Sequence, residues 1–118
     1  MLRSIILLFV AIFLGVILIP IGVLYTGFKK FFKPKYLAEI FYRMAYSIDQ
    51  LGNTSCKYFF NDVLIKNDID NPFGNPDETI SSVLGKNYLK NNLTILGKIL
   101  NTILDFLDTN HSVKSIEN

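Results

Sequence analysis

Three clusters of polar residues carry the side chains that could do chemistry in this sequence. They combine carboxylates with amides and hydroxyls, and the last one also holds the single histidine. A carboxylate close to a histidine can bind a metal ion or exchange a proton with a substrate. The clusters are Asp49, Gln50 and Asn53, then Asp77, Glu78, Thr79, Ser81 and Ser82, and finally Asp105, Asp108 and His111.

Each cluster also has a structural explanation that depends only on its place along a helix. Asp49 and Asn53 are expected near a helix end, where side chains satisfy free backbone groups. Asp77 and Glu78 fall in an expected first helical turn and His111 follows an expected helix C-terminus, so each charge suits the helix dipole. The structural explanation is the stronger one in each case, and we therefore expect no catalytic residue and no enzyme.

The alternative is a small membrane-tethered enzyme that uses Asp49, Glu78 and His111. It requires the helices to fold back so that these three side chains meet, which makes geometry the test between the two readings. Apart from catalysis, the candidates for a shared polar feature are Asp49, Asn53, Asp77, Glu78, Thr79, Ser81 and His111.

The counts of cysteine and histidine limit the remaining chemistry. Cys56 is the only cysteine, which excludes a disulfide framework and a thiolate zinc site built from this chain alone. Asp68 and Asp70 have the spacing of a calcium loop, but the glycine and the distal glutamate of such a loop are missing. We expect no metal site and no cofactor, and we assign the many asparagines to base composition rather than to structure.

The N-terminal segment predicts a transmembrane helix. No charged residue lies between Ser4 and Phe28, and about 20 apolar residues are enough to span the hydrocarbon core. A cleaved signal peptide would have an apolar run of about 7–15 residues and a small-residue cleavage site, and neither feature is present. Pro20 is expected to kink the helix, because proline removes one backbone hydrogen bond.

A group of lysines directly after the apolar run predicts the orientation. It is interleaved with aromatic residues, as expected at the level of the lipid headgroups. The positive-inside rule places this flank, and the domain after it, in the cytoplasm. A plain stop-transfer flank is favoured over specific recognition of anionic lipid. The lysines are Lys29, Lys30, Lys33 and Lys35.

Two apolar stripes with helical spacing predict the long helices of the C-terminal domain. The first supports a helix from about Pro34 to Leu51, which Gly52 would end. The second supports a helix from about Asn91 to Asp108. The stripes are Leu37, Ile40, Phe41, Met44, Ala45, Ile48 and Leu51 in the first helix, and Leu93, Leu96, Ile99, Leu100, Ile103, Leu104 and Leu107 in the second.

The segment between these helices contains a third, shorter one. Asn75 as a cap, Pro76 at the first helical position and Glu78 three residues after the cap predict a helix over residues 76–84, ended by Gly85. Residues 66–75 have turn composition and predict a loop. Residues 56–65 are compatible with a short helix or with an extended buried segment.

Two of the polar clusters also carry a resemblance. Residues 49–53 (Asp-Gln-Leu-Gly-Asn) and 74–82 (Gly-Asn-Pro-Asp-Glu-Thr-Ile-Ser-Ser), with His111 and Ser112, resemble a family of short uncharacterised phage and prophage proteins. That family has an Asp-Gln-x-Gly-Asn box, a Gly-x-Pro-(Asp/Glu)-Glu-Thr-Ile-Ser box and a terminal His-Cys. This chain departs from the pattern at Val83, often an arginine, and at Ser112, often a cysteine. The resemblance covers about residues 42–112 and implies a viral or prophage origin, but no activity.

The sequence as a whole predicts an all-α protein in which one N-terminal transmembrane helix precedes a small domain of about three helices. Residues 1–35 form the anchor with its basic flank, residues 36–110 the domain, and residues 111–118 a polar tail. We expect a single-pass, non-enzymatic interaction protein that serves lysis, infection exclusion or membrane assembly. Its expected partners are the lipid membrane and a protein partner or a second copy. Nucleic acid is not expected, because the residues after 35 carry a net charge of −3.

Overall fold

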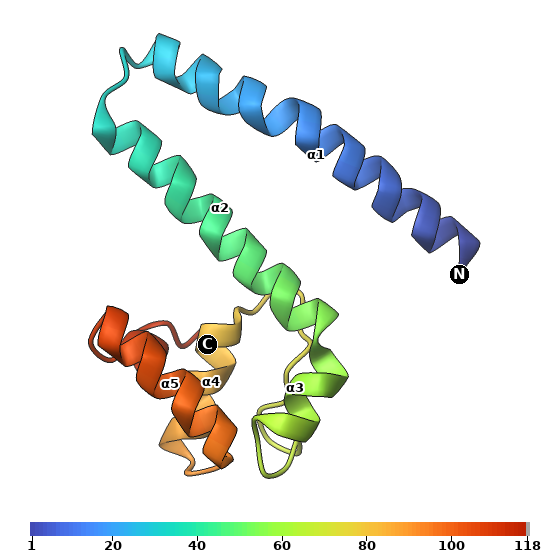
Figure 1. The fold of residues 1–118 in the computed structure, drawn as a ribbon, viewed down its shortest axis with the longest axis vertical. Coiled ribbons are helices and arrows are strands. Elements are labelled where there is room, and N and C mark those ends of the chain that lie inside the picture. Colours follow the sequence, from blue (N-terminus) through green and yellow to red (C-terminus); the bar gives the residue numbers. More distant parts are fainter. Residues whose placement is uncertain (118) are drawn as a thin grey trace. The chain divides into compact units, whose positions relative to one another are not determined.

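The computed structural model describes residues 1–117, and all of the regular elements among them are helices (Figure 1). This confirms the prediction of an all-α protein. Two compact units divide the chain, Met1–Met44 and Ala45–Asn118. The helices are α1 (Leu2–Lys29), α2 (Pro34–Ser55), α3 (Lys57–Val63), α4 (Ile80–Leu89), α5 (Ile95–Leu107) and α6 (His111–Lys114).

α1 is long and apolar enough to cross a membrane, and none of its apolar window is buried. Its 28 residues extend about 42 Å at the usual helical rise, against a hydrocarbon core of about 30 Å. The helix continues through Pro20. It is the only helix among residues 1–117 with this length and composition.

α2 begins at Pro34, as predicted, but it does not stop at Leu51. It runs on to Ser55, so Gly52 lies inside the helix and is not a stop signal. The reason is packing: a Cβ atom at position 52 would lie 2.9 Å from Cδ1 of Ile80. Glycine is used here for close approach, and the ending of the helix does not depend on it.

The core of the second unit is small. It collects apolar side chains from the end of α3, the loop after it, α4 and the start of the α5 segment, and α5 adds two partly buried leucines, Leu100 and Leu104. The buried apolar residues are Leu64, Ile65, Phe73, Val83, Leu84 and Leu93. An isolated antiparallel bridge pairs Ile65 with Leu93 and holds these two buried residues side by side in the core. Residues 56–65 therefore contain both of the predicted alternatives, a short helix followed by an extended buried residue.

α4 differs from the predicted helix over residues 76–84 at both ends. Asn75 and Pro76 form a turn, in which the Asn75 side chain accepts a hydrogen bond from Asp77 N at 3.0 Å. The N-cap is Thr79, whose hydroxyl accepts from Ser82 N at 3.0 Å. Gly85 lies inside the helix and does not end it. The absence of a side chain at this position allows close packing, because a Cβ atom there would lie 2.2 Å from the Ser112 carbonyl oxygen.

α5 begins four residues later than predicted, because Thr94 caps it. The Thr94 hydroxyl accepts from Gly97 N at 3.2 Å and donates to the Val63 carbonyl at 2.6 Å. Asn91, the predicted first residue, has a positive φ of 56° and lies in the turn before the helix. The part of the predicted apolar stripe that lies in α5 divides in two. Leu100 and Leu104 pack on the core, whereas its other residues are exposed: Leu96, Ile99, Ile103 and Leu107.

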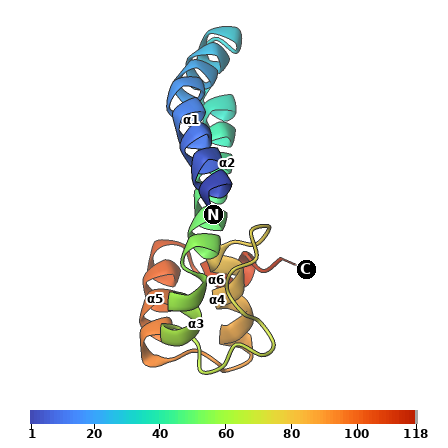
Figure 2. The ribbon, with the colours of Figure 1, turned by 90° about the vertical axis from the view of Figure 1, so that its right-hand side faces the viewer.

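Residues 111–117, most of the expected polar tail, pack against the domain. α6 lies beside α4, as Figure 2 shows, and Ser112 is fully buried. Glu117 N donates to Ser82 Oγ at 2.8 Å, and the Tyr46 hydroxyl donates to the Glu117 carboxylate. The polar side chains of this segment therefore take part in hydrogen bonds with the domain.

Candidate functional site

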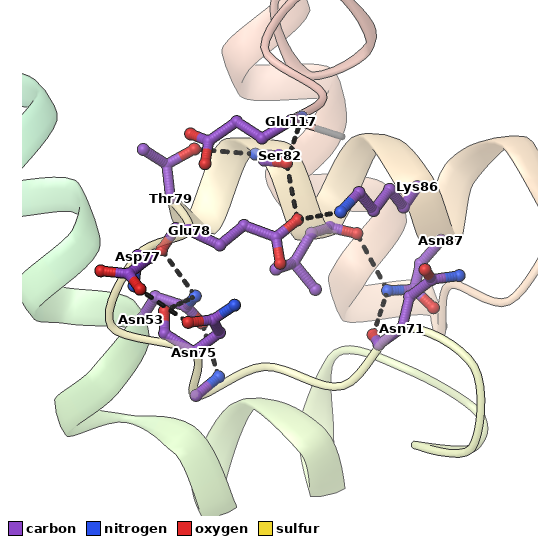
Figure 3. A network of polar contacts seen from close by, with 12 residues as sticks. Asn53, Asn71, Asn75, Asp77, Glu78, Thr79, Ser82, Lys86, Asn87 and Glu117 are labelled. Atoms are coloured by element: carbon purple, nitrogen blue, oxygen red, sulfur yellow. Dashed lines mark hydrogen bonds and ion pairs between the residues drawn. The ribbon is translucent and has the colours of Figure 1, made fainter.

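Most of the predicted polar residues meet between α2 and the segment that leads into α4. Asn53 is completely buried and uses all of its side-chain amide (Figure 3). Its Nδ2 donates to the carbonyls of Asn75 at 3.1 Å and Glu78 at 2.8 Å, and its Oδ1 accepts from Gly74 N at 2.9 Å. One side chain on α2 thereby fixes the backbone of residues 74–78.

Asp49 stands one helical turn before Asn53, on the same face of α2. Its Oδ1 accepts from Ile80 N at 2.8 Å, and its Oδ2 accepts from the Ser81 hydroxyl at 3.1 Å. The first backbone amides of a helix have no partner within the helix and attract negative charge. Asp49 therefore caps α4 from a different helix, and both of its carboxylate oxygens are occupied.

Glu78 and Ser82 extend this network toward the C-terminus (Figure 3). The Ser82 hydroxyl donates to Glu78 Oε1 at 2.7 Å, while Lys86 Nζ lies 2.5 Å from the same oxygen. Lys86 and Glu78 are only 26% and 13% exposed at their side chains, so this ion pair is shielded from solvent. Such a pair acts as part of a hydrogen-bonded network and does not leave a free general acid or base.

We call this set the polar clamp: Asp49, Asn53, Glu78, Thr79, Ser81, Ser82 and Lys86. Asp77 lies beside it but is exposed. The clamp joins α2, the 74–79 segment, α4 and the C-terminal segment through Glu117. Its hydrogen bonds run between parts of this same chain, so the geometry assigns it a structural role.

His111 is separate from the clamp in its polar contacts. Its Nδ1 lies 3.2 Å from Oδ2 of Asp108, and Lys114 Nζ lies 2.7 Å from the other oxygen of that carboxylate. Hydrogen bonds from Lys114 and then His111 lower the pKa of Asp108 below its usual value. Among residues 1–117, no hydrogen bond or ion pair is found that links His111 to Asp49 or Glu78, as the enzyme alternative requires.

Ser112 occupies the position after the histidine and has a buried partner. Its hydroxyl donates to the Asn101 side chain, and Asn101 Nδ2 in turn lies 3.5 Å from Asp105 Oδ2. The other oxygen, Asp105 Oδ1, is buried without a hydrogen-bond partner among the described residues. No group of three or more histidine, cysteine, aspartate or glutamate side chains in residues 1–117 is arranged to hold a metal ion.

Two asparagines with structural hydrogen bonds, the buried Asn87 and the half-buried Asn61, were not among the residues predicted from the sequence. Asn87 is fully buried and donates to the carbonyls of Asn71 and Val83, each at 2.9 Å. Asn61 accepts from Phe73 N at 2.7 Å and donates to the Phe73 carbonyl. The side-chain amides of both residues bond to backbone groups of the loop of residues 66–75, which a neighbouring strand would otherwise do. The signal that could have found them is an asparagine inside an otherwise helical pattern, where it lowers helix propensity and needs a reason.

The basic flank of α1 forms a compact turn. Phe32 N donates to the Gly27 carbonyl at 2.6 Å and Phe31 N to the Phe28 carbonyl at 3.4 Å, which is the pattern of a Schellman ending. Phe31, at the position that glycine usually occupies, has a φ of 55°. The Phe32 ring lies against Gly27, where a Cβ atom would approach within 2.6 Å of the ring.

The lysines of this turn lie among exposed aromatic rings. Lys29 Nζ is 5.7 Å from the centroid of the Tyr25 ring, and Lys30 Nζ is 4.8 Å from that of Tyr36. Phe31 is 84% exposed. We call this group the basic collar: Lys29, Lys30, Lys33 and Lys35 with Tyr25, Phe28, Phe31, Phe32 and Tyr36.

No family model, curated protein or solved structure matches this chain. The resemblance to short phage and prophage proteins therefore remains a prediction from the sequence boxes. The structure adds that residues of both boxes lie in one hydrogen-bonded network.

Proposed function

We propose that the protein is a single-pass membrane protein whose C-terminal domain binds a protein partner or a second copy, without catalysing a reaction. The observation that carries the proposal is α1, a 28-residue helix with no charge between Ser4 and Phe28 and an apolar window that nothing in the chain buries. In water such a surface is strongly unfavourable, whereas a bilayer covers it completely.

The basic collar supports an interfacial position for the end of α1. Lysines and aromatic rings are the residues enriched where a helix leaves the hydrocarbon for the headgroups. The four lysines stand against Arg3 and the amino terminus on the other side of the span, which favours a cytoplasmic C-terminal domain. Contact with headgroup phosphates would be made by Lys29, Lys30, Lys33 and Lys35.

The use of the polar residues supports binding over catalysis. Asp49 and Asn53 satisfy backbone groups, and Glu78 is shared between Ser82 and Lys86. The domain meanwhile exposes large apolar side chains on α5. An exposed apolar patch on a folded domain is typical of a protein interaction surface. With the resemblance to phage proteins, this suits an accessory role in lysis, infection exclusion or membrane assembly.

The test is the extraction behaviour and the orientation of the full chain. A chain with a C-terminal dual reporter should stay in the membrane pellet through alkaline carbonate extraction and give the cytoplasmic signal. Replacement of Leu8, Leu14 and Leu18 by lysine is expected to release the chain into the supernatant, because a charge at the bilayer centre costs about 2.5–3.5 kcal/mol per residue. Extraction of the unaltered chain by carbonate would contradict the proposal, and an external reporter signal would contradict the orientation.

A further inference from the structure

The exposed apolar residues of α5 have a symmetric spacing. Of the 13 residues in this helix, six are apolar and more than half exposed, from 51% at Ile99 to 89% at Phe106. They lie two, five and six residues before Asn101 and two, five and six residues after it. The six are Ile95, Leu96, Ile99, Ile103, Phe106 and Leu107.

This spacing gives a two-heptad seam on the outward side of the helix. Leu96, Ile99, Ile103 and Phe106 follow at steps of three, four and three residues, which is the spacing of the a and d positions of a coiled coil. Leu100 and Leu104 point to the core of the same domain, and Gly97 approaches the Leu64 carbonyl. The seam is therefore not needed for the domain's own core.

We propose that α5 packs against α5 of a second copy in an antiparallel pair. The two-fold axis crosses the seam at the level of Asn101 along the helix. The proposal deepens the proposed function, since it rests on an interaction role for the domain and names its partner as this same chain. A two-fold pair uses one surface twice, so the surface must be complementary to itself when reversed. In this pair Leu96 faces the partner's Phe106, and Ile99 faces the partner's Ile103.

The charged residues of α5 leave the seam entirely apolar. Lys98 and Asp105 are the only two charged residues within the helix, and helical spacing places both on the side away from the seam. Asp105 lies against its own domain, where Asn101 Nδ2 is 3.5 Å from its Oδ2. The symmetric spacing about Asn101 lets all six exposed apolar side chains meet the partner helix in the antiparallel direction.

The composition of α5 favours a second copy over the lipid surface as the occupant. An interfacial amphipathic helix is rich in lysine and arginine on its polar face, whereas α5 has a single lysine.

The size of the seam is adequate for a tethered pair. Six half-exposed side chains of this size offer on the order of 600 Å² per copy, against about 800 Å² per partner in an ordinary stable interface. Two copies held in one membrane meet at a much higher effective concentration than two free domains, and a smaller interface is then sufficient.

The test is disulfide cross-linking of the full chain in membranes. In a Cys56→Ala background, one tagged chain carries Leu96→Cys and a second, differently tagged chain carries Phe106→Cys. Oxidation with copper phenanthroline should give a cross-linked product with both tags. Leu96→Cys expressed alone should give none, because its two copies lie about 15 Å apart along an antiparallel pair. Ile99→Cys with Ile103→Cys provides a second pair if either first variant fails to accumulate.

Matched charge variants complete the test. Ile103→Glu lies in the seam and should abolish the cross-link between positions 96 and 106, while Lys98→Glu, exposed on the side of α5 away from the seam, should retain it. A strong product from Leu96→Cys alone would show a parallel pair and overturn the proposal. So would the absence of any cross-link in chains that resist carbonate extraction. Extraction of the chain by carbonate would instead contradict the membrane anchor, and the cross-linking result would still be read independently.

Discussion

At the scale of single residues, Asn53 shows how one side chain can organise a loop. It is fully buried, and three backbone groups of residues 74–78 depend on it. We expect Asn53→Ala to lower the free energy of unfolding by about 2–4 kcal/mol, because the Gly74 N–H and two carbonyls lose their partner and a buried polar side chain is removed. Chemical denaturation of the full chain in detergent micelles measures this.

The neighbouring residue is the control for this prediction. Thr54 is exposed, and its hydroxyl bonds only to the Gln50 carbonyl within the same helix. Thr54→Ala should change stability by no more than about 0.5 kcal/mol. Equal destabilisation by both variants would show that the loss at position 53 comes from the helix and not from the clamp.

Asp108 gives a prediction about pH. Hydrogen bonds from Lys114 and His111 lower its pKa in the folded state, so its contribution to stability is present above the unfolded value of 3.8 and is lost as the pH falls through the lower folded pKa. Because more than half of the Asp108 side chain is exposed, the effect is small. Asp108→Asn should flatten the decline of the unfolding midpoint below pH 4, measured by denaturant titration at several pH values. An unchanged slope would show that these contacts do not persist in solution.

At the scale of elements, the sequence predicted which segments are helical better than where each helix begins or ends. The long apolar run and the two stripes identified α1, α2 and α5, because hydrophobic periodicity is a local property. Gly52 and Gly85 were interpreted as stop signals and lie inside helices. Their reason is a close approach by Ile80 and by the Ser112 backbone, and tertiary contacts of this kind have no local signature.

The same limit applies to the polar clamp. Asp49, Asn53 and Glu78 were candidates for a polar site, and the structure places all three in the clamp. The partners of Asp49 and Asn53 are backbone groups more than 20 residues away along the chain. The expected capping box at Asn75 was wrong, because Asp49 and Thr79 together supply the acceptors for the first amides of α4. A cap provided by another helix can be identified only once the fold is known.

Gly85 yields the prediction that belongs to this scale. In Gly85→Ala, the new methyl group would meet the Ser112 carbonyl, and α6 must shift away from α4. We expect a net loss of about 1–3 kcal/mol from overpacking, despite a gain of up to about 1 kcal/mol in helix propensity. Hydrogen exchange of the amides of residues 112–117 should accelerate. Gly22→Ala in α1, where nothing lies within 4 Å of the new Cβ atom, is the matched control and should leave this exchange unchanged.

At the scale of the whole molecule, the proposed membrane anchor and the second unit differ in where their apolar residues lie. α1 places apolar side chains on every side, whereas the second unit buries only six apolar residues and relies on buried asparagines, serines and threonines. A core this small contributes limited stability by itself. Hydrogen bonds from α2 add to it, and the proposed pairing of α5 would add more. The two proposals, anchoring and association, would support each other, because a tethered domain with a modest core gains most from a neighbour in the same membrane.

The orientation of the molecule gives the last prediction. The charge difference between the two flanks of α1 depends on four lysines after the span and Arg3 before it. Replacing Lys29, Lys30, Lys33 and Lys35 with glutamine, together with Leu2→Lys and Ser4→Lys, reverses the difference and should turn the C-terminal reporter to the external side. The four glutamine substitutions alone should give a mixed signal with carbonate resistance intact, because the apolar length of α1 is unchanged. A reporter that stays cytoplasmic in the reversed variant would mean that the folded domain, and not the flanking charge, determines the orientation.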